Sequence, residues 1–339
     1  MQSQSLFVLD SVKEKYPLRP ALPKWYTMIS ESTYMMKELG KKRPQSLTAL
    51  EALKACAARC EIEKRSQQLI NLYEELRDHL HKAEIALQVD KFILKKARIL
   101  SNETGLPTIF REDAQFPGDV KADAYQLYVR WYKEDFEQDI LRGIVTSKGK
   151  DRNGDRIDRT YRAKYPNSAR FYGEGNLVLG QWWPTQLCTV RDGAHGASQG
   201  GIFGEKDKGA YSIVLSGGNK YHDQDNGDTI EYSGTEGKDG IPTENTSHLI
   251  HSMDLGNPIR VIRSAQLHKK NKYRPELGFR YDGLYEVKGY KLVDADKAIY
   301  RFALQRCENQ EPIRCEKNAA RRPTIFEVRE YDKLREKVW

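Results

Sequence analysis

The segment from Lys208 to Gly237 constrains the fold of this chain most strongly, because it reads as two strands separated by a polar turn. Its first arm, 210–215, is rich in β-branched and aromatic residues and is followed by a glycine pair. The polar run 222–228 then separates it from the second arm, 229–232. We therefore predict a strand, a turn and a second strand in this segment.

The residues around that turn suit contact with a planar ligand. Gly217 allows a close approach to the backbone, since it carries no β-carbon. Tyr221 and Tyr232 offer flat aromatic faces, and the Asp223 carboxylate accepts hydrogen bonds from an amino group. Together these groups fit a heterocycle with an exocyclic amine, such as a flipped nucleobase. The alternative is an ordinary hairpin, in which the Asp-Asn-Gly run makes the turn and the tyrosines only pack.

The order of short motifs between residues 141 and 329 favours the first interpretation. These motifs resemble, one after another, those of the SRA domain family, also called the YDG family. The matching segments are GGIFG at 200–204, SIVLSGG at 212–218, DQDNGD at 223–228 with YSG at 232–234, NPIRVIR at 257–263, KYRP at 272–275 and RYDGLY at 280–285. The resemblance implies a twisted, partly closed β-barrel flanked by helices, which binds modified cytosine in DNA.

The resemblance also implies roles for the residues near the turn. Tyr221 and Tyr232 would stack on the two faces of the base, and Asp223 would accept a hydrogen bond from the cytosine 4-amino group. The backbone of Ser216-Gly217-Gly218 would contact the edge of the base. Ser233 stands where the family usually has threonine, and it would shape the space for a 5-methyl group.

Some positions depart from the family pattern or stand apart from the pocket. Asn219 and Lys220 separate the glycine pair from Tyr221, whereas the family usually has tyrosine directly after the glycines. The segment from Thr235 to Gly256 is short, although many members carry a long finger there that reads the opposite strand. A preference for hemimethylated CpG is therefore not implied. Gln199 occupies the position of the residue that fills the gap left by the flipped base; a solvated loop glutamine is the alternative.

The charge balance favours polyanionic partners. The chain has 56 lysine and arginine residues against 48 aspartate and glutamate residues, a formal net charge of +8. Polar and basic residues surround the motifs and are our candidates for contacts with the DNA backbone. These residues are Thr235, Lys238, Lys269, Lys270, Lys272 and Arg280. Solvated loop side chains are the alternative interpretation for each of them.

The 5 cysteines show no paired zinc spacing. Cys56 and Cys60 lie one helical turn apart, but no histidine or cysteine pair follows nearby to complete a site. We expect buried thiols, no metal and no cofactor. The N-terminus lacks a signal-peptide pattern, and no apolar run reaches membrane-spanning length. We expect an intracellular, nuclear protein; the short basic run 41–44 fits that location, although a solvated loop explains it as well.

The hydrophobic pattern divides the chain into three parts. Residues 1–45 are mixed and punctuated by proline, and we expect them to be partly ordered. Residues 46–142 carry apolar residues at helical spacing over 46–81, 85–100 and 120–144, which predicts a helical bundle whose last helix runs slightly past the boundary. Residues 143–339 show strand patterns and frequent glycine. We therefore predict an α+β fold: an N-terminal helical bundle followed by the barrel. The bundle is expected to associate with itself or with another protein.

Our leading functional hypothesis is a chromatin-associated reader of modified cytosine, most simply 5-methylcytosine, that flips the base into the tyrosine and aspartate pocket. We expect no catalytic residue and no enzymatic activity, because the sequence shows no zinc-ligand series of a RING or PHD finger and no SET signature. The alternatives are a modification-dependent enzyme such as a nuclease, and a chromatin scaffold that uses the same domain.

Overall fold

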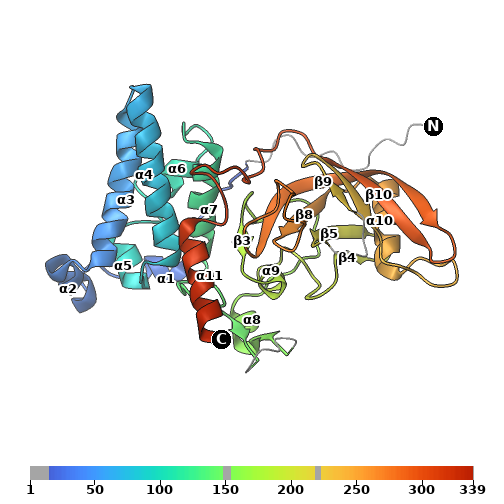
Figure 1. Cartoon of the computed structure of the whole chain (residues 1–339). Coiled ribbons are helices and arrows are strands. Elements are labelled where there is room, and N and C mark those ends of the chain that lie inside the picture. The colour runs from blue at the N-terminus through green and yellow to red at the C-terminus, as the bar shows by residue number, and fades with distance from the viewer. Residues whose placement is uncertain (1–14, 148–153, 218–222, 339) are drawn as a thin grey trace.

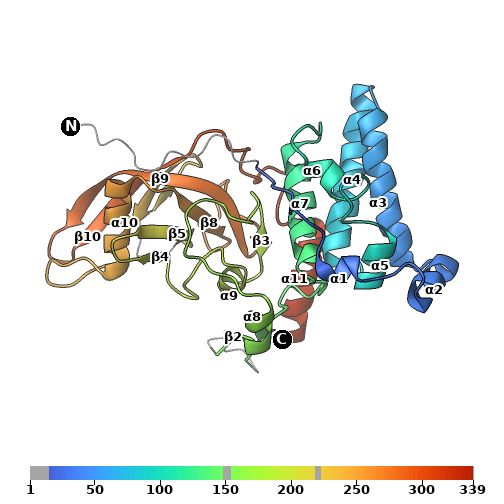
Figure 2. The ribbon, with the colours of Figure 1, turned by 180° about the vertical axis from the view of Figure 1, so that it is seen from behind.

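The computed structural model describes residues 15–147, 154–217 and 223–338. Helices occupy one end of the molecule and strands the other (Figures 1 and 2). We call residues 15–142 the helical unit, residues 143–310 the β unit and residues 311–338 the C-terminal segment. This arrangement confirms the predicted α+β class with an N-terminal helical bundle. No helix in the described ranges is both long enough and apolar enough to cross a membrane.

The helical unit is built around a hairpin of two long helices. Its helices are α1 (Lys24–Thr27), α2 (Tyr34–Lys42), α3 (Gln45–Ile62), α4 (Ser66–Ile85), α5 (Lys91–Lys96), α6 (Pro107–Phe110) and α7 (Gly118–Tyr132). The helical pattern over 46–81 is thus divided between α3 and α4. The break lies at Glu63, whose backbone is extended and whose carboxylate accepts hydrogen bonds from the backbone N–H groups of Lys64 and Arg65. The predicted helix over 120–144 stops at Tyr132, because Glu134 adopts a left-handed conformation with φ of 65°.

Within its described residues, the β unit contains an 8-stranded sheet and a separate 2-stranded one. The small sheet pairs β1 (Ile144–Val145) with β2 (Arg156–Ile157). The large sheet contains β3 (Trp182–Trp183), β4 (Ile202–Glu205), β5 (Gly209–Leu215), β6 (Gln224–Asp225), β7 (Thr229–Ser233), β8 (Ile259–Ser264), β9 (Phe279–Asp294) and β10 (Ile299–Arg306). Its strand order is β4-β5-β8-β9-β10-β7-β6, and β3 pairs with β9. Helices α8 (Arg159–Lys164), α9 (Gln186–Arg191) and α10 (Glu244–Leu255) lie in the connections.

The two predicted arms around the polar turn are both strands, but they do not pair with each other. β5 pairs in parallel with β8 and antiparallel with β4, whereas β7 pairs antiparallel with β10 and β6. The sheet nevertheless curls, since the Tyr232 hydroxyl on β7 donates to the Val214 carbonyl on β5 at 3.5 Å. This contact crosses strands that are far apart in the sheet order, so the sheet forms a partly closed barrel. The predicted arms 210–215 and 229–232 therefore do not form a hairpin with each other. The Asp-Asn-Gly run does make the turn of a short hairpin, but between β6 and β7, where Asp225 is in register with Ile230.

The C-terminal segment joins the helical unit to the β unit. Its helix α11 (Ile325–Val338) packs along α4 of the helical unit (Figure 1). Residues of α11, including Tyr331, also pack against an apolar cluster that contains Ile85 of α4 and Trp182 of β3. The Tyr331 and Trp182 rings lie 6.1 Å apart in an edge-on arrangement. The C-terminal segment therefore shares a core with both units.

Asp123 of α7 is the charged centre of this joint. Arg314 donates to its two carboxylate oxygens at 2.6 and 2.8 Å, Arg322 donates at 3.1 Å, and His81 lies at 2.7 Å. Burial disfavours the Asp123 charge, but the guanidinium groups of Arg314 and Arg322 outweigh that effect and hold its pKa well below the usual range. The predicted boundary at residue 143 thus lies between Asp123 and the arginines Arg314 and Arg322, which form buried ion pairs with it. The division into domains stays a prediction.

We predict that Asp123→Ala lowers the free energy of unfolding of the full chain by about 3–5 kcal/mol, because buried arginines lose their carboxylate. Urea denaturation followed by circular dichroism measures the change. The matched control is Asp78→Ala, which removes an exposed carboxylate of α4 and should change stability by no more than about 0.5 kcal/mol. Equal denaturation midpoints for the two variants would show that the Asp123 ion pairs add nothing to stability.

Candidate nucleic-acid interface

Asp223 stands directly before β6 and is held by β7. Its Oδ1 accepts a hydrogen bond from the backbone N–H of Ser233 at 2.8 Å. The side chain is half-buried. Burial raises the pKa of Asp223, while the hydrogen bonds from Ser233 and the charge of Arg301 oppose that rise. The carboxylate is therefore fixed in position and partly shielded from water, which strengthens its interaction with a donor.

Tyr232 lies beside Ser233 on β7, in register with Phe302 of β10. Its side chain is buried, with 6% of its surface exposed, and it belongs to the barrel core. A β-carbon on Gly201 would lie only 2.6 Å from the Tyr232 hydroxyl oxygen, so the absence of a side chain at Gly201 makes room for this tyrosine. The ring is rigidly placed, and its use as a stacking wall stays a prediction.

The end of β5 runs against the loop 265–278. Gly217 has φ of 63°, in the left-handed region that favours glycine. A β-carbon there would lie 3.1 Å from the Leu267 Cα and 3.2 Å from the Gln266 carbonyl oxygen. Ser216 is partly exposed beside it. The other two predicted pocket residues of this segment, Gly218 and Tyr221, lie outside the described residues.

The turn that follows Asp223 is clamped by Arg263 of β8. The Arg263 guanidinium donates to both oxygens of Asp225, at 2.9 and 2.7 Å, and to the Gly227 carbonyl at 3.0 Å. Asn271 donates to Asp225 at 3.0 Å. Burial disfavours the charge of Asp225, but its bonds to Arg263 outweigh that effect and lower its pKa. The ion pair thus fixes the backbone that leads from Asp223 into β7.

A second aspartate extends this clamp into β9. Arg263 also donates to Asp282 at 3.1 Å, and Arg280 donates to the two oxygens of Asp282 at 2.6 and 2.9 Å. The remaining donors of Arg280 reach the carbonyls of Tyr273, at 2.6 Å, and Arg322, at 3.0 Å. We call the residues Asp225, Arg263, Asp282 and Arg280 the buried ion chain.

The predicted phosphate contact of Arg280 is wrong. Its side chain has 1% of its surface exposed, and its donors are used within the protein. The sequence held a signal for this pairing. Arg280 and Asp282 lie two residues apart in a strand, so their side chains point to the same face of the sheet. Both residues are part of the RYDG motif, which here builds the scaffold behind the turn.

The lysines of the loop 265–278 are exposed. Lys269, Lys270 and Lys272 all point to the surface, and the Lys272 ammonium lies 4.8 Å from the centre of the Tyr273 ring. The loop itself is fixed, since Arg274 donates to the Ala265 carbonyl at 2.6 Å and Asn271 reaches the turn at Asp225. Three cations are thus displayed next to the candidate pocket.

The loop before β4 approaches the same region from the other side. Gln199 is exposed, and it lies two residues before the glycine that faces Tyr232. His195 anchors this loop: its Nε2 donates to the Gly200 carbonyl at 2.9 Å, and its Nδ1 pairs with the Ser212 hydroxyl at 2.8 Å. Burial lowers the pKa of His195 to about 4, so the ring is neutral at pH 7. Gln186 donates to the same carbonyl at 2.8 Å.

The segment between β7 and β8 contains no extended finger in the structure, which describes it throughout. Thr235 and Lys238 are exposed, and a β-bridge links Lys238 to Ile241. Helix α10 follows at once and packs on β5, where the Ser252 hydroxyl accepts a hydrogen bond from the Ala210 N–H at 2.7 Å. The segment is a short loop and a helix that supports the barrel.

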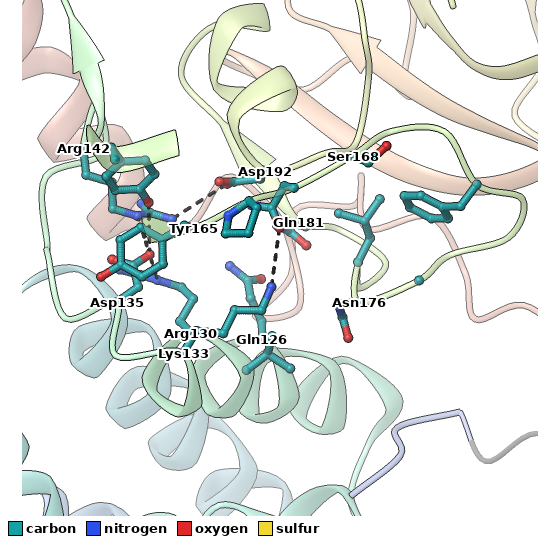
Figure 3. A pocket seen from close by; sticks show the side chains of 17 residues that line it. Gln126, Arg130, Lys133, Asp135, Arg142, Tyr165, Ser168, Asn176, Gln181 and Asp192 are labelled. Atoms are coloured by element: carbon teal, nitrogen blue, oxygen red, sulfur yellow. Dashed lines mark hydrogen bonds and ion pairs between the residues drawn. The ribbon is translucent and has the colours of Figure 1, made fainter. Parts of the chain in front are cut away.

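A separate cavity of about 490 Å³ lies between α7 and the segment 161–192 (Figure 3). Its wall includes Lys133, which reaches the Asn167 side-chain oxygen at 3.5 Å, and Arg142, which donates to Asp135 at 2.9 Å. Among the predicted pocket residues that the structure describes, none lines this cavity. It belongs to the joint between the helical unit and the β unit.

Comparison with known protein families agrees with the order of the motifs. The profile of the SAD/SRA domain family matches residues 172–310. These residues form a SAD/SRA domain. The match includes the turn with Asp223, the buried ion chain and the basic loop, so the resemblance predicted from the sequence is confirmed.

Individual relatives share this domain. A UHRF1-like protein of Cryptococcus neoformans is 32% identical over 179 residues, which are 46% of this chain and 51% of the relative. ORTHRUS 2 of Arabidopsis thaliana is 34% identical over 151 residues, which are 40% of this chain and 23% of the relative. A crystal structure of the SUVH5 SRA domain with methylated CHH DNA is 29% identical, covers 42% of this chain and 99% of its own, and has a TM-score of 0.36. The chain therefore spans about half, or less, of the length of these curated relatives.

The comparisons contradict the expectation that the protein is not an enzyme. ORTHRUS 2, UHRF1 of Xenopus laevis and UHRF2 of Mus musculus are each named as E3 ubiquitin-protein ligases, which are enzymes. The matched segments make up 23%, 21% and 18% of those proteins. The SRA domain itself is not catalytic. The presence of this domain is therefore no ground for excluding enzymatic activity.

We predict that Asp225→Ala lowers the free energy of unfolding by about 3–5 kcal/mol, since it leaves buried Arg263 without its bidentate partner. Asp228→Ala changes the same turn and is the control. The Asp228 side chain is exposed, and its Oδ1 makes only a long surface ion pair with the Arg306 Nη1 at 3.9 Å, which adds little to stability. Chemical denaturation of both variants measures the difference. A stability loss no greater than that of the control would mean that the clamp is dispensable.

Proposed function

We propose that this protein reads modified cytosine, and 5-methylcytosine in particular, in double-stranded DNA by turning the base out of the duplex into the site around Asp223. The observation that carries the proposal is the fixed Asp223 carboxylate, which is held by the Ser233 N–H within the residues that match the SAD/SRA family. SRA domains of SUVH5 have been crystallised with methylated DNA, which supports the same ligand class.

The Asp223 carboxylate supplies a chemical basis for choosing cytosine. The cytosine 4-amino group is a donor and satisfies the carboxylate, whereas thymine presents a carbonyl at that position and would leave two acceptors facing each other. Because Asp223 is half-buried, an unmatched contact is not relieved fully by water. Flipping costs a few kcal/mol, and this contact, together with stacking, offsets part of it.

The remaining predicted pocket residues complete the proposal. Tyr232 and Tyr221 stack on the base, and the backbone of Ser216-Gly217-Gly218 contacts its edge. Ser233 borders the 5-methyl group; a serine here is smaller than the threonine that is usual in the family. Gln199 enters the duplex to occupy the space of the flipped base. Support comes from the anchored loop that displays Gln199.

The DNA backbone is contacted by exposed groups around this site, in our proposal. These are Thr235, Lys238, Lys269, Lys270 and Lys272, all of which are exposed. Because phosphate contacts fix position and add affinity without reading sequence, they should bind modified and unmodified DNA alike.

We also propose that the protein acts on chromatin in the nucleus and that its helical unit serves association with a protein partner or a second copy. The domain division at residue 143 belongs to this proposal. One face of the helical unit already contacts the C-terminal segment through Asp123, so a partner would bind elsewhere on α3, α4 or α7.

We predict that Asp223→Ala reduces the preference for methylated over unmodified duplexes by about 1.5–3 kcal/mol, since the flipped methylated base loses its hydrogen bond to a charged acceptor, whereas unmodified DNA is held through its phosphates. Competition binding with duplexes that differ only at one cytosine measures this preference at fixed salt. Binding to unmodified DNA and its salt slope should not change, because the lysines are retained. Asp228→Ala is the control in the same turn. An unaltered preference in Asp223→Ala would remove Asp223 from the site.

The short segment between β7 and β8 predicts similar affinity for hemimethylated and fully methylated sites. This segment contains only a short loop and helix α10, with no extension that could contact the second DNA strand. The methyl group on that DNA strand is therefore not sensed by this segment. Titrations with matched hemi- and fully methylated duplexes at two salt concentrations test this expectation. A strong preference for the hemimethylated duplex that persists at high salt would contradict it.

A further inference from the structure

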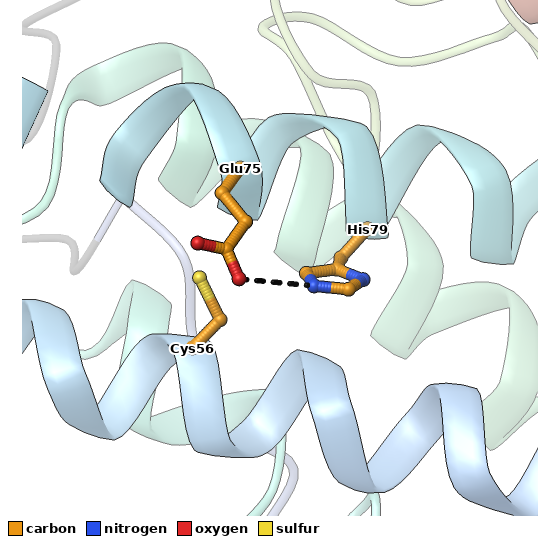
Figure 4. Close-up of side chains that lie close together, drawn as sticks. All are labelled: Cys56, Glu75 and His79. Atoms are coloured by element: carbon orange, nitrogen blue, oxygen red, sulfur yellow. Dashed lines mark ion pairs between the residues drawn. The ribbon is translucent and has the colours of Figure 1, made fainter. Parts of the chain in front are cut away.

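A group of metal-binding side chains lies between α3 and α4 of the helical unit, far from the SAD/SRA domain. Cys56 and Cys60 are one turn apart on α3, and Glu75 and His79 are one turn apart on α4. Figure 4 shows the Glu75 and His79 side chains directed toward the Cys56 thiol across the helix pair. Residues at this spacing lie on the same face of a helix, so each helix presents a pair of ligands to the other.

The ligand atoms are already close together. One ligand atom from each of Cys56, Glu75 and His79 lies within 4.8 Å of the others, and the His79 Nε2 lies 3.6 Å from the Glu75 Oε1. In the absence of metal, the Cys56 thiol donates to the Leu72 carbonyl of α4 at 3.6 Å. In a tetrahedral zinc site, bond lengths of about 2.0–2.3 Å place the ligands about 3.3–3.8 Å apart. The observed ligand atoms are up to 4.8 Å apart, slightly farther than in such a site. Glu75 and His79 are partly exposed, so rotation of their side chains can bring the ligand atoms to the shorter separation.

We propose that Cys56, Glu75 and His79 form a zinc site that links α3 to α4, with Cys60, one turn further along α3, turning in as the fourth ligand. Two thiolates, an imidazole and a carboxylate are a ligand set that suits Zn²⁺ better than the hard cations Mg²⁺ and Ca²⁺. On binding, the two thiols release their protons to solvent and coordinate as thiolates. The burial of both cysteines provides a dry inner side for the metal, and the two partly exposed ligands provide an entry path.

The existing ion pair of Glu75 does not block coordination of a metal. Arg59 pairs with Glu75 in the structure, but 54% of the Arg59 side chain is exposed, so it can turn to solvent when the carboxylate coordinates. A metal here would tie the two long helices together near the break at residues 63–65.

The test uses the purified full chain, stripped with a chelator and then titrated with Zn²⁺ against a chromogenic competitor. We expect one zinc ion per chain and a rise in melting temperature with zinc. Substitution with Co²⁺ should give a tetrahedral spectrum with a thiolate-to-cobalt band. His79→Ala and Cys56→Ser should each lose stoichiometric zinc binding, and Cys56→Ser should also weaken the thiolate band.

The matched control is Cys307→Ser, which removes a half-buried thiol of the β unit and should keep the site intact. If Cys56→Ser fails to fold, Glu75→Gln and His79→Ala carry the test, because their side chains are partly exposed and their loss leaves the core filled. The absence of stoichiometric zinc binding by the folded wild-type chain would overturn the proposal. So would zinc binding that survives in both His79→Ala and Cys56→Ser.

Discussion

The buried ion chain from Asp225 through Arg263 and Asp282 to Arg280 holds the β unit in its functional shape. Charges in a protein interior are costly unless each has a well-placed partner. Here the two arginines and two aspartates alternate, and backbone carbonyls take the spare donors. The buried ion chain connects β6, β8 and β9, and β6 is not a neighbour of the other two strands in the sheet. It therefore determines how the strands close on one another, in addition to satisfying its own charges.

The same contacts reach the helical unit. Arg280 donates to the Arg322 carbonyl, and the Arg322 guanidinium donates to Asp123 of α7. Glu327 of α11 accepts a further hydrogen bond from Arg322 at 2.6 Å. The C-terminal segment is thus the piece through which the scaffold of the SAD/SRA domain and the helical bundle meet. The helical unit is in this sense part of the support for the turn that carries Asp223.

The candidate interface divides its tasks between buried and exposed residues. The conspicuous charged residues of the motifs, Arg263, Arg280 and Asp282, are buried and shape the turn. Asp223 remains partly accessible to a ligand, and the loop 265–278, which carries the exposed lysines, is joined to the same turn through the hydrogen bond from Asn271 to Asp225. A reader of a base needs both parts, because affinity from phosphates carries no information about the base and a single acceptor needs a fixed position.

Much of this organisation followed from the sequence alone. The strands around the polar turn, the helical bundle before residue 143 and the proximity of Asp223 to the YSG element were all predictable, because each depends on local periodicity or on motifs with a fixed order. Tertiary structure alone showed that β5 and β7 belong to opposite parts of a curled sheet, that Arg280 faces Asp282 inside the protein, and that Glu75 and His79 meet Cys56. Those facts depend on which distant segments pack together, and a one-dimensional pattern specifies the face of an element without naming the partner that covers it.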